Sequence, residues 1–480
     1  MALRQLRELI GEGNIAPIHC DGHEILRRLF VTVRDSSWRE VPPSIFEATV
    51  DEQRGRIDFT AHHRSDLIDF AWQGALIVGD AGRLLRFEFE GRALRDMNIC
   101  RLGLVVLHPV ASMIGARLEI DGAGVRQHRV VDSDIAPQPI VDGVPGAMSE
   151  PFTTLSIERA GFGQLLLHFS GDQFELEDQR NWGDASFKTY CTPLRRGFPR
   201  LVTAGTIISQ SVEARFIPAH AAELGEPRIA ATSTKFPLLG REWRSEMPEA
   251  DHGQWDFLHF DTSLHAPQAL AKLLARSSTR IQLGLDAVDV SEQAATWLPL
   301  LRGYRDRVSR ILLYGPGVSI PAAAAVEQWQ IEIARFAVGP IELCAATRGH
   351  YVEFNRGIAF DVPVGSAAFP LTATVHGEDS RTLAENTATI HDMVATLRRR
   401  TGQASVVIAP LAWHYPSRDA ALSATAPVIT PLVETWLVDT LSNAIAAGVA
   451  AITVAEDLLP AVRSMPGGSA AGWVARLARH

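Results

Sequence analysis

The spacing of apolar residues changes near residue 216, and this change limits the folds that the chain can adopt. Before it, short apolar runs are separated by Gly, Asp and Asn, as in the DAG of residues 80–82 and the DGAG of residues 121–124. Such spacing is typical of antiparallel strands joined by tight turns. We therefore expect an antiparallel β-sandwich over residues 1–216.

A Pro-containing linker follows at residues 217–235, and beyond it strand-like runs alternate with helix-length segments over residues 236–480. This alternation predicts a TIM (β/α)8 barrel. A doubly wound open sheet is the competing prediction, but it usually carries a Gly-rich phosphate loop, and no GxGxxG or Walker motif occurs. The strand candidates are residues 236–239, 257–261, 281–285, 311–314, 341–346, 371–375, 406–410 and 451–454. The helix candidates are residues 267–275, 291–302, 321–335, 381–400, 431–447 and 467–480.

Composition argues against several classes of partner. The net charge is −9 and the longest basic run is the triplet of residues 398–400, so we expect no nucleic acid partner and place the triplet at a helix C-terminus. Residues 1–13 lack an apolar signal region and no apolar run reaches transmembrane length, so no membrane partner is expected. The 4 cysteines form no CxxC or Cys/His cluster, which predicts neither disulfides nor zinc and favours the cytoplasm. No cofactor is expected, and a homo-oligomer stays open.

Residues 174–194, FELEDQRNWGDASFKTYCTPL, combine many charges with large aromatic rings. Burying unpaired charges is costly, so a core strand would have to pair them. One interpretation is a polar loop that enters a sugar-sized pocket or seals a domain junction. The other is a surface hairpin with an aromatic underside that braces only its own domain.

Within this segment, EDQRNWGDASFKTYCTPL closely resembles a run of the D-apionate lactonase family of bacterial sugar-acid catabolism. Four shorter stretches resemble the same family and occur in its order. They are RLGLVVLHP at 101–109, YVEFNR at 351–356, TVHGEDSRTLAEN at 374–386 and ITVAED at 452–457. The resemblance implies a β-sandwich followed by a TIM-like barrel, and a hydrolase that opens D-apionolactone or a closely similar aldonolactone to D-apionate.

Polar residues at the predicted strand ends are the candidates for chemistry, because TIM barrels carry their active sites there. For a lactonase, Glu353 and Glu456 would divide the roles of base and acid, and His376 would donate to the oxyanion or the ring oxygen. Substrate-binding candidates are Asp261, Asn355 and Trp413, together with Asp178, Asn181, Asp184 and Lys188 of the 174–194 segment. Simpler explanations stay open: Asp286 and Asp379 as helix caps, Glu353 as a first-turn acid and His414 as a loop residue.

Other hydrolase chemistries have less support. The chain has no GxSxG elbow of a serine esterase and no HExxH pair of a zinc hydrolase. It also has no acid at the ends of the fourth and seventh predicted strands, where retaining glycosidases on TIM barrels usually carry their carboxylates. A glycoside hydrolase that uses Glu353 and Glu456 is the alternative enzyme, and an inactive carbohydrate-binding protein is the alternative of another class. Residues 348–350 and 454–455 depart from the family pattern beside the expected pocket, so they leave the exact lactone open.

Overall fold

The computed structural model describes residues 6–11, 13–122, 124–219, 235–357, 365–373, 375–376, 379–402, 405–414 and 430–464. The chain divides into two compact units. The first unit comprises Met1–Ser133, Gln138–Gln179 and Ala185–Arg228, and the second comprises Asp134–Pro137, Arg180–Asp184 and Ile229–His480. Two short segments of the N-terminal half, Asp134–Pro137 and Arg180–Asp184, therefore belong to the second unit.

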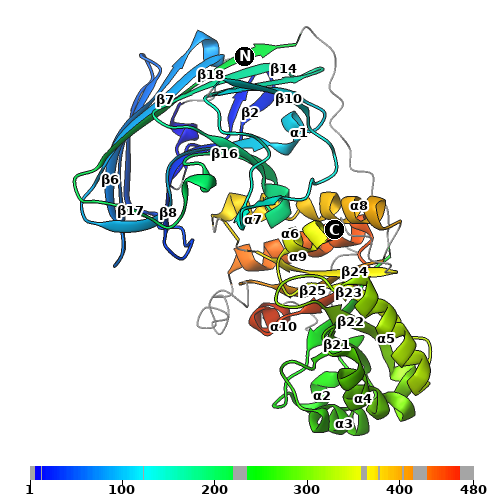
Figure 1. Ribbon diagram of the computed structural model, residues 1–480. Coiled ribbons are helices and arrows are strands. Elements are labelled where there is room, and N and C mark those ends of the chain that lie inside the picture. The colour runs from blue at the N-terminus through cyan, green and yellow to red at the C-terminus, as the bar shows by residue number, and fades with distance from the viewer. Residues whose placement is uncertain are drawn as a thin grey trace. The chain divides into compact units, whose positions relative to one another are not determined.

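The first unit is built from antiparallel sheets (Figure 1). The larger is a 9-stranded sheet in the order β10-β9-β13-β14-β18-β7-β6-β5-β4. Its strands are β4 (Pro43–Asp51), β5 (Arg56–Arg64), β6 (Asp69–Gly79), β7 (Leu84–Ala93), β9 (Arg117–Gly122), β10 (Val125–Val130), β13 (Thr154–Arg159), β14 (Gly163–Ser170) and β18 (Ile207–Pro218). The smaller sheet joins β15 (Glu175–Asp178), β16 (Ser186–Tyr190), β8 (Met97–Pro109), β17 (Arg200–Val202) and β3 (Arg28–Asp35).

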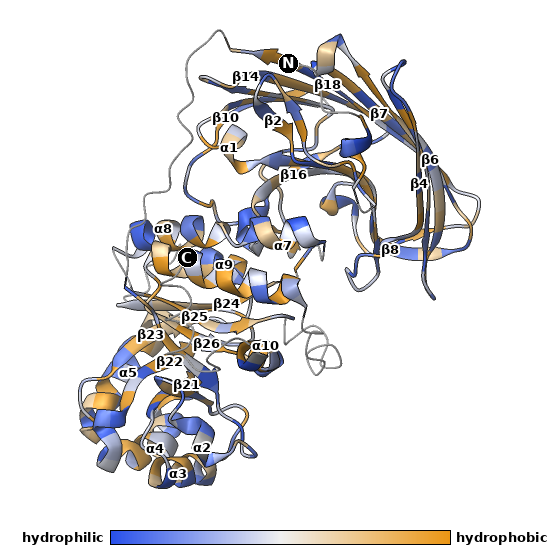
Figure 2. Ribbon diagram, turned by 180° about the vertical axis from the view of Figure 1, so that it is seen from behind, coloured by the Kyte–Doolittle hydropathy of each residue, from blue (hydrophilic) through white to orange (hydrophobic). Residues whose placement is uncertain are grey.

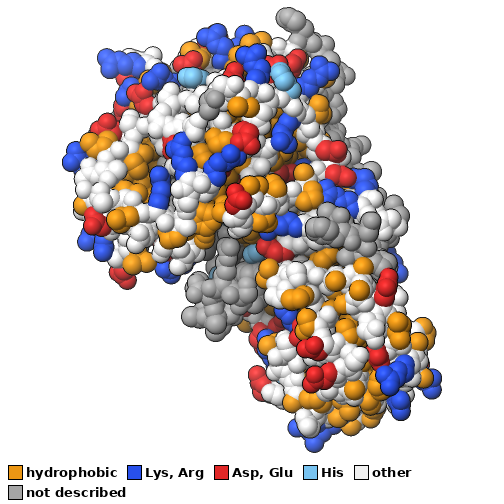
Figure 3. Space-filling view, in the orientation of Figure 1, with side chains coloured by type: hydrophobic (Ala, Val, Ile, Leu, Met, Phe, Trp, Pro, Cys, Tyr) orange, Lys and Arg blue, Asp and Glu red, His pale blue; other side chains and the backbone are white. Residues whose placement is uncertain are grey.

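Both sheets contribute to one apolar core. Strands β5 and β7 alternate buried and exposed residues along their length. Figure 2 shows hydrophilic and hydrophobic residues mixed along the strands of this unit. Phe87 and Phe89 of the larger sheet share a buried cluster with Leu102 and Leu104 of the smaller one. On the face seen in Figure 3, acidic and basic side chains are interspersed over this unit.

The hairpin β15–β16 is buried along its whole length, so its charged side chains have to be paired. The Lys188 ammonium donates to Oε1 of Gln179 at 2.9 Å and lies 3.7 Å from Glu177. The Tyr190 hydroxyl donates to Glu175 at 3.2 Å. This part of residues 174–194 is thus a polar hairpin inside the first unit and does not lie on its surface.

The second unit contains a closed barrel of eight parallel strands in chain order, which excludes the doubly wound open sheet. The strands are β19 (Leu238–Glu242), β20 (Phe257–Asp261), β21 (Arg280–Asp286), β22 (Val308–Tyr314), β23 (Glu342–Ala346), β24 (Ser366–Thr372), β25 (Ser405–Ala412) and β26 (Ala451–Val454).

The prediction of a TIM (β/α)8 barrel is wrong, because the described connections do not form a regular ring of helices. The helices are few: α2 (Glu249–His252), α3 (Pro267–Arg276), α4 (Val290–Leu301), α5 (Ala323–Phe336), α6 (Tyr351–Gly357), α7 (Ser380–Asn386), α8 (Thr389–Thr401), α9 (Pro431–Ala447) and α10 (Leu459–Ser464). Helices α2, α6, α7 and α10 are at most two turns long. A parallel crossover needs a sufficient length of chain but does not have to be one full helix.

One expected helix, residues 381–400, is two helices, α7 and α8, and the expected helix at 467–480 lies outside the described residues. Helices α8 and α9 pack against one another beside the barrel (Figure 1). Nowhere in the described ranges is a helix both long enough and apolar enough to cross a membrane.

The barrel interior contains both an apolar cluster and a buried polar network. Buried apolar side chains from six strands, among them Phe257, Leu312 and Tyr314, form the cluster. In the network Gln282 donates to Thr453 at 3.0 Å, and the Arg310 guanidinium donates to Gln282 at 3.4 Å and to Glu342 at 3.0 Å. Buried polar groups are stable only when hydrogen-bonded, and this network meets that condition.

The tight interior gives a stability prediction. A Cβ added at Gly240 would lie 2.3 Å from the Phe257 ring, which is buried in the interior. We expect Gly240→Ala to lower the free energy of unfolding by about 1–3 kcal/mol in urea titration, because overpacking forces the ring or the backbone to shift. Gly253→Ala is the control, since nothing lies within 4 Å of its added Cβ, and it should change stability by less than about 1 kcal/mol. Equal losses would contradict the packing described here.

Candidate active site

Side chains at the carboxyl ends of neighbouring barrel strands converge on Arg348, which follows β23. Alternate residues of a strand face the same side, so Asp261 faces the interior with Phe257 and His259. The Arg348 guanidinium donates to both carboxylate oxygens of Asp261 and, at 3.1 Å, to Asp286 at the end of β21. It also lies 3.9 Å above the Tyr314 ring. These four residues, Asp261, Asp286, Tyr314 and Arg348, are called the rim cluster below.

Burial and ion pairing set the protonation states of Asp261, Tyr314 and the neighbouring His259. Burial would raise the pKa of Asp261, but the hydrogen bonds and positive charge of Arg348 outweigh it, so the pKa is lowered. Burial raises the pKa of Tyr314, which keeps the phenol neutral. Burial lowers the pKa of His259 below the cluster to about 4, so that imidazole is neutral at physiological pH. The rim therefore presents one cation held by two carboxylates.

Glu242, at the end of β19, lies beside this cluster. Burial raises the pKa of Glu242, Arg244 opposes the shift, and the negative charges of Asp261 and Asp457 add to it. Arg244 donates to the Glu242 carboxylate at 3.1 Å. Asp457, which follows β26, accepts backbone N–H bonds from Trp413 and His414 at 3.0 Å each and ties the ends of β25 and β26 together.

The segment Arg180–Asp184 brings a second set of groups to the same unit. Nδ1 of His376 hydrogen-bonds to Oδ2 of Asp184, and Asn386 donates to the other carboxylate oxygen at 2.9 Å. Asp184 is 7% exposed, so the pair is largely shielded from water. A carboxylate on Nδ1 fixes the imidazole orientation and favours the tautomer whose Nε2 can act as a base.

Buried polar contacts hold this segment in place. Arg180 is fully buried and donates to Asp392 on α8 at 3.1 Å. Thr389 at the start of α8 donates to the carbonyl of Gly183 at 3.0 Å. Asn355 donates to Asn181 at 2.9 Å. Contacts on both sides of Trp182 thus fix where Asp184 lies.

Trp182 lies between His376 and the loop that carries Arg348. Its ring meets His350 edge-on at 5.5 Å and His376 edge-on at 5.6 Å between ring centroids. His350 follows Arg348 by two residues, so their Cα atoms are at most about 7 Å apart. Trp182 therefore contacts both the Asp184–His376 pair and the loop that carries Arg348.

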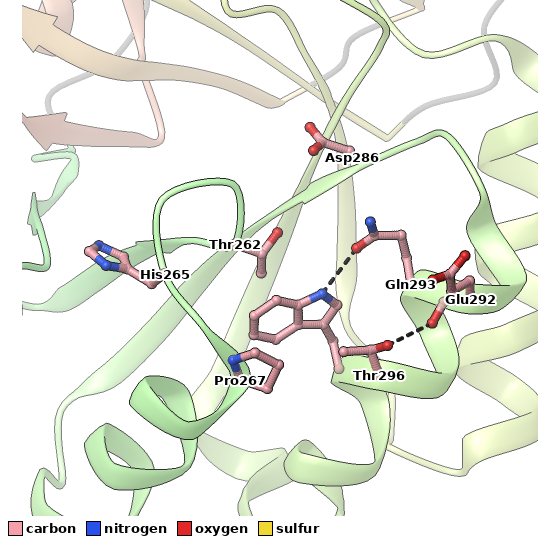
Figure 4. Close-up of a pocket in the computed structure, with 8 residues that line it drawn as sticks. Thr262, His265, Pro267, Asp286, Glu292, Gln293 and Thr296 are labelled. Atoms are coloured by element: carbon pink, nitrogen blue, oxygen red, sulfur yellow. Dashed lines mark hydrogen bonds between the residues drawn. The ribbon is translucent and has the colours of Figure 1, made fainter.

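A cavity of about 330 Å³ adjoins the rim cluster on the side of β20 and β21 (Figure 4). Asp286 belongs to both the cluster and the cavity lining. The figure shows Thr262 and His265 on the loop after β20, and Glu292, Gln293 and Thr296 on α4. The described residues contain no group of three or more His, Cys, Asp or Glu side chains arranged to hold a metal ion.

The predicted catalytic carboxylates lie in different surroundings. Glu353 is in the first turn of α6, 3.6 Å from Arg356, and its side chain lies over Gly349. Glu456 is largely exposed and accepts from Arg241 at 2.9 Å.

The predicted binding residues other than Asp261 are buried. Asn355 is fully buried, accepts from Arg400 at 2.9 Å, and holds Asn181 and the carbonyl of Ile135. Trp413 packs edge-on against Trp436. Asp178 and Lys188 are buried in the first unit. Asp379 caps α7 by accepting from Thr382, so that simpler explanation is confirmed, whereas Asp286 pairs with Arg348.

Sequence reasoning missed Glu242, Arg348 and Trp182 as parts of the site. The first barrel strand was expected to end at residue 239, whereas β19 continues through Glu242. Arg348 stood out in the sequence as a polar residue after the fifth predicted strand and as a departure from the family pattern, but it was not chosen as a site residue. A basic residue two positions after an apolar strand, with acids ending two earlier strands, is the signal that marks it.

The rim cluster predicts a pH-dependent loss of stability in Arg348→Met. In the native protein Asp261 has a lowered pKa, so its contribution is present above its ordinary value of 3.8 and lost at lower pH. Without Arg348, burial dominates and stability instead falls as the pH rises above 3.8. The deficit of the variant should therefore grow between pH 4 and pH 7, to the order of 1–3 kcal/mol by urea titration, less than for a fully buried pair.

The control for this experiment is Arg348→Met combined with Asp261→Asn. Removing the carboxylate should abolish most of the pH dependence, because no buried charge is left unpaired. A deficit of the single variant that stays constant from pH 4 to pH 7 would contradict the ionic role of Arg348.

Known protein sequences are similar to the N-terminal half of the chain. Residues 3–218 match the family described as D-apionate lactonase, N-terminal domain. A D-apionate lactonase of Brucella anthropi is 27% identical over 250 residues, which cover 48% of this chain and 38% of that protein, well under two thirds of its length.

The solved structures are less similar to this chain in sequence than the Brucella anthropi protein is. A galactose mutarotase-like protein of Lactobacillus casei (11% identity, TM-score 0.29) is matched over 43% of this chain and 96% of its own. An alpha-galactosidase of Geobacillus stearothermophilus (9% identity, TM-score 0.26) is matched over 89% and 72%. TM-scores this low carry no argument about this protein. The sequence matches, in contrast, support the resemblance of the motifs, and residues 3–218 are similar to the N-terminal domain of D-apionate lactonases.

Proposed function

We propose that this protein is a lactonase that hydrolyses D-apionolactone, or a closely similar aldonolactone, to the corresponding sugar acid in bacterial sugar-acid catabolism. The family match and the Brucella anthropi relative support the reaction class. The observation that carries the mechanism is the hydrogen bond between Asp184 and Nδ1 of His376. It supplies an oriented imidazole, which lactone hydrolysis requires as a base.

In the proposed reaction, Nε2 of His376 accepts a proton from water as the water oxygen attacks the lactone carbonyl. The carbonyl π electrons move onto its oxygen and give a tetrahedral oxyanion. When the oxyanion collapses, the bond from carbon to the ring oxygen breaks, and His376 returns the proton to the leaving alkoxide. Asp184 stabilises the imidazolium between these two steps.

The rim cluster provides the remaining groups. Arg348 is a fixed cation in a partly buried setting, and such a charge stabilises a developing oxyanion more strongly than a solvated one. Its partners Asp261 and Asp286 hold the guanidinium in place before the substrate arrives. Glu242 and Asp261 suit hydrogen bonds to the hydroxyls of the sugar acid.

In this proposal Glu353 and Glu456, which were predicted to act as base and acid, have positioning roles instead. Glu456 pairs with Arg241 at the barrel rim, and Glu353 lies against the Arg348–His350 loop, so both position other groups and neither transfers the proton. Asn355, Asn181 and Arg400 act as positioning residues, because their hydrogen bonds hold the segment that carries Asp184.

The reaction class is tested with purified protein on D-apionolactone, a panel of aldonolactones and aryl glycosides. We expect proton release from lactones alone, followed with a pH indicator at constant buffer. Release of nitrophenol from aryl glycosides would replace the proposal with a glycoside hydrolase. Saturable lactone binding without turnover would replace it with a carbohydrate-binding protein.

The catalytic pair is tested by His376→Gln and Asp184→Asn. His376→Gln should lower kcat by about 10²–10⁴-fold, since a general base is lost. Asp184→Asn should lower kcat in the same direction, because the amide can donate to Nδ1 and favours the wrong tautomer. Thermal unfolding of each variant separates a catalytic loss from a loss of folding.

Asn386→Ala is the matched control. It removes the hydrogen bond to the other Asp184 oxygen but leaves the His376 contact, so kcat should fall far less than in Asp184→Asn. A folded His376→Gln protein with near-normal kcat would contradict the assignment of the base.

A further inference from the structure

The cavity beside the rim cluster has its own chemistry, which the proposed mechanism does not use. It lies between the loop after β20 and the first turns of α4 (Figure 4). Its volume of about 330 Å³ is near the lower end of ligand pockets, which span about 300–1,000 Å³. A space of this size suits one small ring and excludes a long chain.

The lining offers both donors and acceptors at fixed positions. Nε2 of His265 lies 3.2 Å from the carbonyl oxygen of Trp243, which can only accept, so Nε2 carries the proton and Nδ1 is an acceptor. Oε1 of Gln293 accepts from the Trp297 indole at 3.0 Å, which leaves the amide N–H groups as donors. Oδ1 of Asp286 accepts a hydrogen bond from Arg348, and Oδ2 can accept one from a ligand hydroxyl.

The charges of the lining disfavour an anionic ligand. Burial lowers the pKa of His265, so the ring is uncharged at neutral pH. Arg348 lies 3.1 Å from Asp286 and shares its charge with Asp261. Glu292 is exposed and lies in the first turn of α4, where the helix dipole favours an acid. None of the lining residues is Lys or Arg, and the two carboxylates can accept hydrogen bonds from hydroxyl groups of a neutral ligand.

Vicinal hydroxyl groups match such a lining, because each hydroxyl both donates and accepts. Pro267 and the buried ring of Trp297 add an apolar surface, against which the C–H face of a sugar ring can pack. Asp286 is shared with the rim cluster, so a ring in the cavity would be next to a lactone bound at Arg348.

We propose that this cavity binds a neutral sugar ring and that, resting on the proposed lactonase function, the ring belongs to the substrate. The substrate class would then be aldonolactones that carry a second sugar, with the lactone at the Arg348–His376 site and the second ring in the cavity.

Binding is measured by isothermal titration with methyl β-D-xylopyranoside, a neutral single ring. Thr296 lines the cavity from the exposed side of α4, so Thr296→Trp would fill the space with an indole. We expect this variant to weaken binding at least tenfold. Ala295→Trp places the same side chain on an exposed neighbour outside the lining and should leave binding unchanged.

Turnover is measured with D-xylono-1,4-lactone and with the lactone of xylobionic acid, which carries a second xylose. We expect Thr296→Trp to lower kcat/KM for the two-ring lactone at least tenfold and to leave the one-ring lactone within twofold. Ala295→Trp should leave both unchanged. Equal effects of Thr296→Trp on both lactones, or unchanged xyloside binding, would overturn the proposal.

The two proposals fail in different ways. If neither these two lactones nor D-apionolactone is hydrolysed, the lactonase function fails, and the titration with Thr296→Trp still decides whether the cavity binds a neutral ring. If both lactones are hydrolysed but the native protein does not bind the xyloside, the lactonase function stands and the cavity proposal is overturned. Thermal unfolding of both Trp variants must match that of the native protein for these comparisons.

Discussion

The site depends on one buried arginine. Arg180 is completely inaccessible, and an unpaired guanidinium there would cost several kcal/mol, so it must have an anionic partner. That partner is Asp392 on α8. The ion pair, with the hydrogen bonds of Asn181 and Gly183, fixes the segment Arg180–Asp184 within the second unit. As a consequence, the Asp184 carboxylate lies where it can orient His376, a residue 192 positions away along the chain.

Much of the secondary structure could be predicted from the sequence, because local patterns determine it. Strands β20 and β26 and helix α9 have the predicted ends, since apolar runs, Pro431 at the helix start and Gly448 at its end mark them. Strand β24 begins at Ser366, five residues before the expected start. Its first three residues, Ser-Ala-Ala, are small and carry little of the bulky apolar character by which strands are recognised. The regular helix ring was wrongly predicted because helix-length segments need not be helices. Their sequences set the spacing between strands but not the number of helical turns.

The candidate site was less predictable, since its geometry depends on long-range contacts. His376, Asp184 and Asp261 were recognised as polar residues in suitable positions, but no local pattern indicates that Asp184 meets His376. Glu353 and Glu456 stood at strand ends and in family motifs, yet their nearest described cations are Arg356 and Arg241. Arg348 was recognised as a polar residue after the fifth strand and as a departure from the family, but it was given no role. Its partners Asp261 and Asp286 come from β20 and β21, and the parallel pairing of β20 through β23 brings the three together.

The central claim is that Asp184 holds His376 as a base, and the tautomer of His376 tests it most directly. Nitrogen-15 NMR of ring-labelled histidine, assigned with His376→Asn, reports which ring nitrogen carries the proton. We expect a protonated Nδ1 and an unprotonated Nε2 in the neutral ring of the free enzyme, and a changed ratio of tautomers in Asp184→Asn. A neutral ring with its proton on Nε2, or a spectrum unaffected by Asp184→Asn, would show that Asp184 does not orient His376 as a base.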